Sequence, residues 1–486
     1  MPSGSLNSPL KPGDVVIDEI ELESYTGFRT SLKGIFENFI IYEDIYSNCM
    51  SGSITLIDSM NLVRHFPIIG AETLTITYKT PFGGAEPVTL KFRTYKISVY
   101  VETAQEATQM VRIEFISPAA IKSMQTKISK SYRNMPVSDM VNEIYREYLA
   151  LDKDKNILGG AAKGAAYGAA IGSMVPIPII GTVAGGAVGA LSGLASALNQ
   201  DPKIPLFTLQ PTFDNRTYVI PYWNPLYTIN WLAHRARAKE NQTYCDYVFF
   251  ENSDGFHFVS LSQLKKQEAD VTFTNYPAGF RDERGDRMFN AEWRNVFSMT
   301  VEDITDKIKQ QNLATFGSTI LTHDLTTKSF NTFKFDYDSK FAEVGSHIES
   351  NPLIPKGKTD YSKATLSSLK YYPSTTYTME GLDRIVDPED TILYRQSLLT
   401  QMDSVNVILE CHGDTQVKVG DVIELITIGK ESTKGSDKFD DDYLKGKYLV
   451  TAIRHVVTDR NHRMTLTVSR DSFGEPVADF KKPTLV

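Results

Sequence analysis

Two glycine ladders lie back to back near the middle of the sequence. Glycine recurs at every fourth position in each ladder, and the break between them, 176–180, contains two prolines. Four residues advance roughly 400° around an α-helix, so each ladder would form a slowly drifting stripe without side chains. The pattern predicts a Gly/Ala-rich hairpin of two close-packing helices, an insert spanning 155–199. Its candidate packing or membrane-contact residues are Gly160, Gly164, Gly168, Gly172, Gly181, Gly185, Gly189 and Gly193.

The eight glycines must serve a purpose, because each costs a helix interior about 1 kcal/mol relative to alanine. Glycine stripes allow helix backbones to approach closely, as small-xxx-small motifs do in membranes. The halves 158–175 and 179–198 would span roughly 27 and 30 Å, close to the thickness of a bilayer's hydrocarbon core. Lys163 is the only charged residue in either half. Alanine and glycine nevertheless bury little apolar surface, so insertion would be marginal. A mobile surface loop, a hairpin packed against protein and a membrane hairpin all remain open.

The bulk properties place the remainder among ordinary multidomain proteins. A chain of 486 residues predicts about three or four domains. The net charge of −8 argues against a nucleic-acid-binding protein that holds phosphates on a basic face. Three widely separated cysteines form no disulfide framework, which favours free thiols in a reducing cytoplasm. Residues 1–13 read as a flexible arm and not as a signal peptide.

Hydrophobic patterning outside the insert predicts a mainly β chain with an α+β middle. Residues 14–118 alternate as strands do, most clearly over 73–78, and predict a tube-like antiparallel β-barrel domain. Residues 119–280 mix helical and strand spacing and form the α+β domain that the insert interrupts. A second such barrel is expected from 281–340 and 403–475, with a loop-rich and helical excursion at 341–402 and a tail at 476–486. The stretches 69–76 and 419–425 echo one another, which suggests two related β domains.

No catalytic or metal-binding motif emerges. Phosphate-loop spacing fails, and zinc spacing is absent because Cys411 and His412 stand alone on what reads as one strand. The acidic run 440–442 lacks the glycine and glutamate of a calcium loop. His455 is interpreted as a structural strand residue. We therefore expect neither an enzyme nor a cofactor or metal site.

Several short phrases occur in order along the chain: Ile41-Tyr42-Glu43-Asp44-Ile45-Tyr46-Ser47-Asn48, Met50-Ser51-Gly52, Ile57-Asp58-Ser59, Phe66-Pro67-Ile68-Ile69-Gly70, Val248-Phe249-Phe250-Glu251-Asn252 with Gly255-Phe256, and Gly446-Lys447-Tyr448-Leu449-Val450-Thr451 with Ile453-Arg454-His455. In this order they resemble the baseplate hub proteins of contractile-tailed bacteriophages. The resemblance covers most of 35–473, while the insert departs from the family's usual pattern.

The resemblance implies a structural virion protein of the tail baseplate, made in the host cytoplasm. It implies a homotrimer whose three pairs of tube-like domains form a pseudo-six-fold ring, adapting the six-fold tail tube to the three-fold cell-puncturing spike. Implied partners are the central spike protein, a tail tube or tube-initiator protein, the tape measure protein and baseplate wedge proteins. DNA would pass through the channel without specific binding, which an acidic chain suits.

Two further hypotheses concern the insert within this framework. The hairpin could plug or line the lumen of the trimer, or it could enter the host membrane during DNA delivery. The alternative function is accordingly a membrane-active delivery protein whose β domains serve as scaffold. Liposome binding by the soluble chain would distinguish that alternative from a hub.

Overall fold

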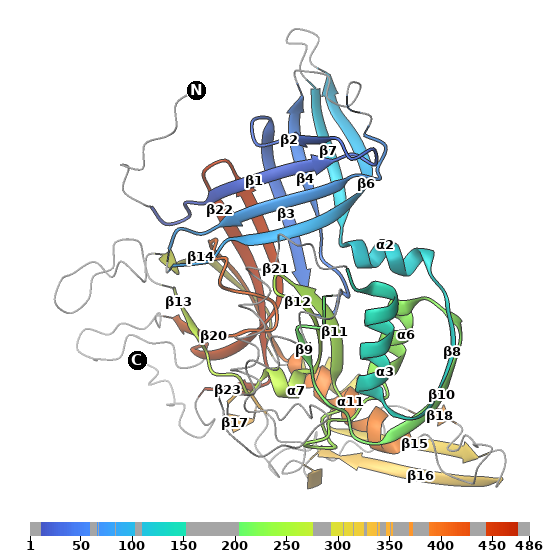
Figure 1. Cartoon of the computed structure of the whole chain (residues 1–486). Coiled ribbons are helices and arrows are strands. Elements are labelled where there is room, and N and C mark those ends of the chain that lie inside the picture. The colour runs from blue at the N-terminus through green and yellow to red at the C-terminus, as the bar shows by residue number, and fades with distance from the viewer. Residues whose placement is uncertain are drawn as a thin grey trace, which may run out of the picture.

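A computed structural model describes the chain over most of its β and mixed regions (Figure 1). The described residues are 11–58, 66, 68–82, 84–102, 109–151, 204–275, 293–304, 306–313, 315–324, 328–337, 339–340, 347–349, 351–352, 369–372, 388–427 and 444–474. Strands from both ends of this range join into one curled sheet of 13 strands, so the expected mainly β fold is confirmed.

The first β unit follows the alternation of its sequence. In the strand Thr73–Lys79, Leu74, Ile76 and Tyr78 are buried while the residues between them are half-exposed, as a strand with one face on a core requires. The neighbouring strands contribute to the same apolar core. The strands of this unit are β1 (Val16–Glu23), β2 (Arg29–Ser31), β3 (Phe36–Asp44), β4 (Ser51–Asp58), β5 (Thr73–Lys79), β6 (Val88–Glu102) and β7 (Gln109–Ile116).

The second β unit lies mainly at the other end of the chain and has its own core. Its strands are β13 (Val271–Asn275), β14 (Val296–Ile304), β19 (Val405–His412), β20 (Val422–Thr427), β21 (Gly446–Thr458) and β22 (His462–Arg470). The ladder runs β14-β19-β22-β21-β20-β13. The amide of Thr274 donates to the carbonyl of Arg294 at 3.1 Å, and Thr274 forms an isolated bridge with Asn295. The two ends of the unit therefore meet.

The two units repeat the same strand pairing. Four antiparallel ladders of the first unit, β3-β4, β4-β7, β7-β6 and β6-β5, recur in the second as β14-β19, β19-β22, β22-β21 and β21-β20. Strands β3 to β7 thus correspond in chain order to β14, β19, β20, β21 and β22. The fifth pairing differs, because β5-β1 is antiparallel and β20-β13 is parallel.

Irregularities in register recur at equivalent places. In the first unit Arg93 pairs with both Thr73 and Ile116, and the register then shifts between Thr94 and Lys96. In the second, Leu449 pairs with both Val422 and Ser469 before a shift between Val450 and Ala452. The shift between Phe36 and Asn38 in β3 likewise matches that between Val296 and Ser298 in β14. Bulges redirect side chains and are specific features of a fold, so this agreement indicates an internal repeat.

The loops that lead into β5 and β20 also share a hydrogen-bonding plan. The Glu72 carboxylate accepts from the amide of Ile69 at 2.7 Å, and that of Asp421 accepts from the amide of Lys418 at 2.9 Å. In both loops the carbonyl of the acidic residue then accepts from the long strand, from Thr94 in one unit and from Val450 in the other. The echo seen in the sequence around these loops therefore has a counterpart in backbone geometry.

A mixed α/β region lies beside the repeated units (Figure 1). Pro118 and Pro225 begin two of its helices, where proline loses no hydrogen bond. Its elements share a separate core. They are α2 (Pro118–Gln125), β8 (Ile128–Pro136), α3 (Val137–Ile144), a π-helical turn (Tyr145–Leu149), β9 (Thr208–Leu209), β10 (Asn215–Trp223), α6 (Pro225–Ala233), β11 (Tyr247–Asn252), β12 (Gly255–Ser260) and α7 (Leu261–Leu264).

The remaining elements form two small sheets and two helices. Strands β15 (Gly317–Asp324), β16 (Ser329–Asp336) and β18 (Leu369–Tyr372) make a sheet whose core includes Leu393 and Leu398 of helix α11 (Pro388–Met402). Helix α9 (Lys307–Asn312) precedes this sheet. Strand β17 (Asn351–Pro352) pairs with β23 (Ser472–Phe473).

Two pairings cut across the domain ranges expected from the sequence. Strand β13 lies within 119–280, yet it pairs with β20 of the second unit. Strands β15 and β16 lie within 281–340, yet they pair with β18 and not with the large sheet. Pairing between distant segments leaves no mark in local periodicity, which explains both differences. The domain boundaries themselves stay predictions. The insert 155–199, residues 1–10 of the arm 1–13 and the tail 476–486 lie outside the described residues.

Gly52 in β4 tests the packing of the first unit. A Cβ at this position would lie 2.2 Å from the carbonyl oxygen of Ile40 and 2.5 Å from the Phe115 ring. Because backbone of the adjacent strand blocks the space, we expect Gly52→Ala to lower the free energy of unfolding by about 1–3 kcal/mol. Urea denaturation followed by tryptophan fluorescence measures the loss. Thr55→Ala, at a half-buried position of the same strand, is the control. Equal stability of the two variants would contradict the packing described.

Candidate functional site: the junction of the two β units

Strand β3 of the first unit and β21 of the second form the junction between the units. They pair antiparallel from Asn38–Thr458 to Asp44–Ala452, which makes the blue and red strands of Figure 1 neighbours. On the inward face Phe39, Ile41, Ile453 and Val457 are 2% exposed or less. Val457 belongs to the core of the first unit although it lies on a strand of the second. The junction is therefore a continuation of both cores and not a loose contact.

Glu43 is the acidic residue on that inward face, 3% exposed. Its carboxyl lies 3.5 Å from the Val419 amide, which donates to it, and 3.9 Å from Nε2 of His455. Burial raises the pKa of Glu43 to about 8, although the hydrogen bond from Val419 and the charge of Lys418 oppose the shift. Burial lowers the pKa of His455 to about 4. At neutral pH the carboxyl is thus protonated and the imidazole neutral, so this contact is polar but not an ion pair.

A second histidine extends the polar group. Nε2 of His462 lies 3.0 Å from Nδ1 of His455. Burial, and then the neighbouring His455, keep the pKa of His462 well below its usual value. A Cβ on Gly413 would lie 1.9 Å from the His462 ring, so that position has room only for glycine. The sequence already indicated a structural role for His455, and the structure provides one.

The mixed region ties the two units together through β11. The Glu251 carboxylate accepts from the amide of Met50 at 3.0 Å and from the hydroxyl of Ser117 at 2.9 Å, both at the ends of first-unit strands. One residue further, the side-chain Nδ2 of Asn252 donates to the backbone carbonyl of Val419 in the second unit at 3.1 Å. Adjacent residues of one strand thus hold both units, which fixes their relative placement.

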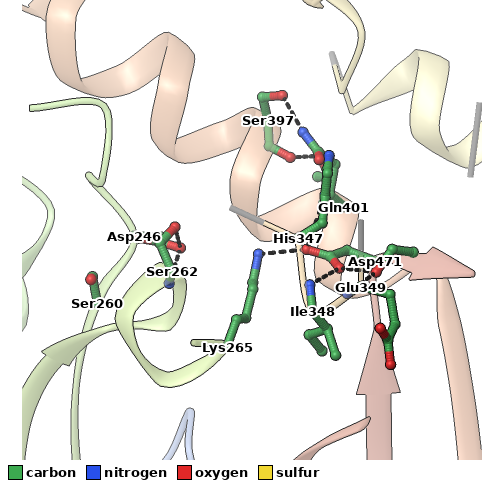
Figure 2. Close-up of polar contacts among 12 residues, drawn as sticks. Asp246, Ser260, Ser262, Lys265, His347, Ile348, Glu349, Ser397, Gln401 and Asp471 are labelled. Atoms are coloured by element: carbon green, nitrogen blue, oxygen red, sulfur yellow. Dashed lines mark hydrogen bonds and ion pairs between the residues drawn. The ribbon is translucent and has the colours of Figure 1, made fainter. Parts of the chain in front are cut away.

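A buried ion pair anchors the far end of the second unit (Figure 2). Nζ of Lys265, just after α7, lies 2.8 Å from Oδ2 of Asp471, and both side chains are fully buried. Oδ1 of Asp471 accepts from the amide of Ile348 and from the hydroxyl of Ser472, each at 3.0 Å. Burial alone would raise the pKa of Asp471, but Lys265 and His347 hold it well below its usual value. The pair joins the mixed region, the segment 347–349 and the end of the large sheet.

Two strand edges stay open within the described part of the chain. Strand β6 pairs with β5 only up to Arg93, so the same side of its second half has no partner strand. Strand β14 ends the ladder of the large sheet and pairs along its length only with β19, while Thr274 of β13 bridges to Asn295 just before it. At the opposite end, β2 is three residues long and Arg29 forms ion pairs with Glu21 and Glu23. A short, charged strand protects an edge, whereas the edges of β6 and β14 are long.

The predicted packing glycines, Gly160 to Gly193, all lie outside the described residues, and their role stays a prediction. In the described part, no helix is long and apolar enough to cross a membrane, and no group of three or more His, Cys, Asp and Glu could hold a metal ion. Sequence reasoning did not single out Glu43, although an acid at an inward position after Phe39 and Ile41 is a readable signal. Lys265 gave no signal of its own.

Comparison with known proteins adds a relative. No protein-family model matches this sequence. Over 297 residues the chain is 21% identical to the probable baseplate hub protein gp334 of Vibrio phage KVP40, a match covering 58% of this chain and 66% of that protein. The chain resembles a phage baseplate hub protein. This confirms the resemblance expected from the sequence, and it supports a structural role in a phage baseplate. The matched region spans slightly less than two thirds of the relative.

Solved structures give more distant likenesses. The tail protein from Neisseria meningitidis MC58 has a TM-score of 0.45 at 9% identity, covering 94% of this chain and 97% of that one. The 43 kDa tail protein of prophage MuSo2 from Shewanella oneidensis has a TM-score of 0.45 at 10% identity, covering 93% and 98%.

The buried ion pair yields a stability prediction. Lys265→Met leaves the Asp471 charge buried without its cation, so we expect a loss of about 3–5 kcal/mol in the free energy of unfolding. The loss should shrink in an Asp471→Asn background, where no charge remains to be compensated. Urea denaturation of the four proteins measures this coupling. Lys447→Met, which removes a surface ion pair with the exposed Glu268, is the control and should change stability little because water screens that pair. Additive losses at 265 and 471 would contradict the pairing.

The buried carboxyl of Glu43 predicts a pH dependence. Its folded-state pKa of about 8 lies above the ordinary value of 4.5, so its contribution to stability is full below pH 4.5 and is lost as pH rises through 8. The slope is at most about 1.4 kcal/mol per pH unit. Glu43→Gln should therefore gain stability relative to the original protein between pH 5.5 and 8.5.

Comparing the two proteins at each pH isolates the contribution of Glu43 to stability. The contributions of the charged groups around it, Lys418, Asp421 and Asp254, and of His455 are common to both proteins. The measurement is the urea midpoint from pH 5.5 to 8.5. Glu37→Gln, the same change at an exposed position of β3, is the matched control. A difference between Glu43→Gln and the original protein that does not change with pH would rule out a buried, protonated Glu43.

Proposed function

We propose that this chain is the structural hub of a phage baseplate, a homotrimer in which each subunit supplies two tube-like β-barrel domains. The observation that carries the proposal is the internal repeat: two β units with the same strand order, joined along β3 and β21. The similarity to the baseplate hub protein of Vibrio phage KVP40 supports the same role. The role is structural, and no catalysis is required of it.

Two repeated units per chain suit a symmetry adaptor. Three copies provide six quasi-equivalent units, which can face a six-fold tail tube on one side, while the three mixed regions preserve three-fold symmetry for a central spike. A heterologous contact, in which two different surfaces meet, can repeat around a closed ring and place all six units in similar positions. The rigid β3-β21 junction supports the proposal, because hinged units could not present a regular ring.

The proposed partners follow from this position in the virion's tail baseplate. A tail tube or tube-initiator protein would contact one face of the ring, the central spike protein the other, and wedge proteins the periphery. The tape measure protein and then DNA would pass through the lumen. A net charge of −8 favours passage of DNA without specific binding, because basic walls would retain phosphates. The insert 155–199 is proposed to be an accessory that leaves the ring intact.

Light scattering tests the proposal. We expect the purified full-length protein, at micromolar concentration, to have three times the mass of its 54.4 kDa chain, or to contain three copies of the chain in its complex with the spike partner. A variant lacking 155–199 should give the same stoichiometry, because the repeated units lie outside that segment. Multi-angle light scattering coupled to size exclusion measures both masses.

Either of two results would contradict part of the proposal. A full-length protein that stays monomeric in the presence of the spike would rule out the hub ring. A trimer that forms only with 155–199 present would make the glycine ladders the contact between subunits, and the insert would then be no accessory.

A further inference from the structure

We infer that the outer face of the β8-β10 ribbon docks on the surface of an anionic phospholipid bilayer. The inference goes beyond the proposed hub role and does not depend on the trimer. It rests on the distribution of charge in the mixed region, on the side chains that the ribbon presents, and on the place where the insert leaves the fold. This outer ribbon face consists of Lys127, Ser129, Ser131, Arg133, Val219, Pro221 and Tyr222, all of them exposed.

The chain is acidic, but the segments that form the ribbon and its two flanking helices are basic. Residues 115–138, with α2 and β8, and residues 215–239, with β10 and α6, contain no Asp or Glu. Together they carry a charge of +8, so the remainder of the chain carries −16. The residues responsible are Lys122, Lys127, Lys130, Arg133, Arg216, Arg235, Arg237 and Lys239.

Acids just outside these two segments neutralise only part of this charge. Lys130 forms ion pairs with Glu143 and Glu147, and Asp214 pairs with both Arg216 and Arg237. Even with these three carboxylates counted, the region keeps a positive surplus in a protein whose total charge is −8. A local surplus of this sign attracts an anionic partner.

Strand alternation separates the two faces of the ribbon. The residues that alternate with the buried ones form the outer face, where Val219 lies opposite Ser131 and is 69% exposed. Lys127 and Arg133 lie at the two ends of this face, so basic side chains bracket a hydrophobic centre. Figure 1 shows the ribbon at the outer edge of the mixed region, with α3 and α6 on its other side. The inner face packs into the core of that region through Ile128, Tyr132, Tyr218 and Ile220.

Tyr222 adds an aromatic ring to the outer ribbon face at a bulge. The register shifts between Pro221 and Trp223, which leaves Tyr222 as the extra residue of β10. Its backbone is left-handed, with a φ of 57°, and its side chain is 69% exposed. A left-handed backbone is unusual for a bulky residue, and bulges redirect side chains. The fold thus holds an exposed ring in an unfavourable backbone conformation, which points to a role outside the core.

The neighbouring aromatic residues favour a bilayer over a ligand that stacks on rings. Trp223 packs edge-to-face against Tyr227 and Trp231, with ring centroids 5.1 and 5.4 Å apart. The Arg235 guanidinium lies over the Trp231 ring at 3.9 Å. These rings therefore contact one another and a cation, whereas stacked bases need open ring faces. The outer ribbon face instead presents one tyrosine beside aliphatic side chains and flanking basic residues, the composition of surfaces that lie among lipid headgroups.

The place where the insert leaves the fold supports the same partner. The described chain stops at Leu151 and resumes at Ile204, whose amide donates to the Leu151 carbonyl at 2.9 Å. Lys122 of α2 lies at this exit, because its Nζ donates to the carbonyl of Ala150 at 2.8 Å. The two halves of the insert between these ends carry a single charge. A nearly uncharged segment that begins beside a basic, acid-free region fits an anionic bilayer better than a nucleic acid in water.

Vesicle flotation tests the inference on the full-length protein. We expect the protein to float with vesicles of equal parts phosphatidylcholine and phosphatidylglycerol at about 50 mM salt, and not with phosphatidylcholine alone or at about 0.5 M salt. Lys127→Gln/Arg133→Gln should weaken binding about 25-fold, because each basic residue near an anionic surface contributes about fivefold. The matched control is Lys334→Gln/Arg460→Gln, which removes two exposed charges elsewhere and should leave binding nearly unchanged.

Substitutions of Tyr222 separate the contact from folding. Asparagine adopts a left-handed backbone readily, so Tyr222→Asn should fold as well as the original protein while it binds vesicles about fivefold more weakly, because the ring is lost. Tyr222→Trp keeps an aromatic ring and should retain binding, with a blue shift in its added emission on the anionic vesicles. Tyr25→Asn removes a ring that is 62% exposed on the first unit and is the control. Circular dichroism checks that each variant folds.

Two kinds of result would overturn the inference. Flotation that the face variants and their controls reduce equally, or no flotation at all, would show that the outer ribbon face does not meet a bilayer. Face-dependent binding of a fluorescent single-stranded oligonucleotide that is tighter than binding of the vesicles would assign the face to nucleic acid instead. Because the face lies outside the repeated units, the mass measured by light scattering tests the hub separately from the bilayer contact.

Discussion

The antiparallel ladder between β3 and β21 is the interaction on which the remainder of the molecule depends. It joins strands from opposite ends of the chain and places Val457 of the second unit in the core of the first. A slip of one residue in such a ladder would turn every inward side chain outward, so its register must be strongly specified. Fully buried apolar residues on both strands, together with the hydrogen bonds of Glu251 and Asn252, specify it.

The buried polar groups solve two different problems. At the junction, Glu43 and the two histidines are held in their neutral forms by burial, so they need only hydrogen-bond partners and add no charge to the core. At the far end, Lys265 and Asp471 are charged, and the carboxylate has additional donors from Ile348 and Ser472. Neutral groups suit an interior that two units share. The ion pair of Lys265 and Asp471, with the hydrogen bond from Ile348, links three separate segments of the chain.

Local structure could be predicted from the sequence, and distant pairing could not. The alternation over 73–78 predicted β5. The echo around Gly70 and Gly420 pointed to two related units, and the strand orders agree with it. The parallel partner of β13 and the separate sheet of β15, β16 and β18 depend on segments far apart in sequence, which hydrophobic periodicity does not record. The alternation with Phe39 and Ile41 could have marked Glu43 as an inward acid, but its partners Val419 and His455 lie far away in the sequence.

The repeat also explains where the two units may differ. The inward residues Phe39, Ile41 and Ile453 of the junction have the apolar residues Met299, Val301 and Ile97 at the equivalent positions of the other unit. Surfaces that meet other partners are free to diverge. The loop before β20 is covered by the chain's own β11, whose Asn252 donates to Val419, whereas the loop before β5 presents Ile69 at 64% exposure. The fifth strand pairing, antiparallel in one unit and parallel in the other, diverges in the same way. The two units thus share the order of five strands and differ at the fifth pairing and at the loop that the mixed region covers. That distribution agrees with the proposed ring, in which the two units of a duplicated chain take quasi-equivalent places.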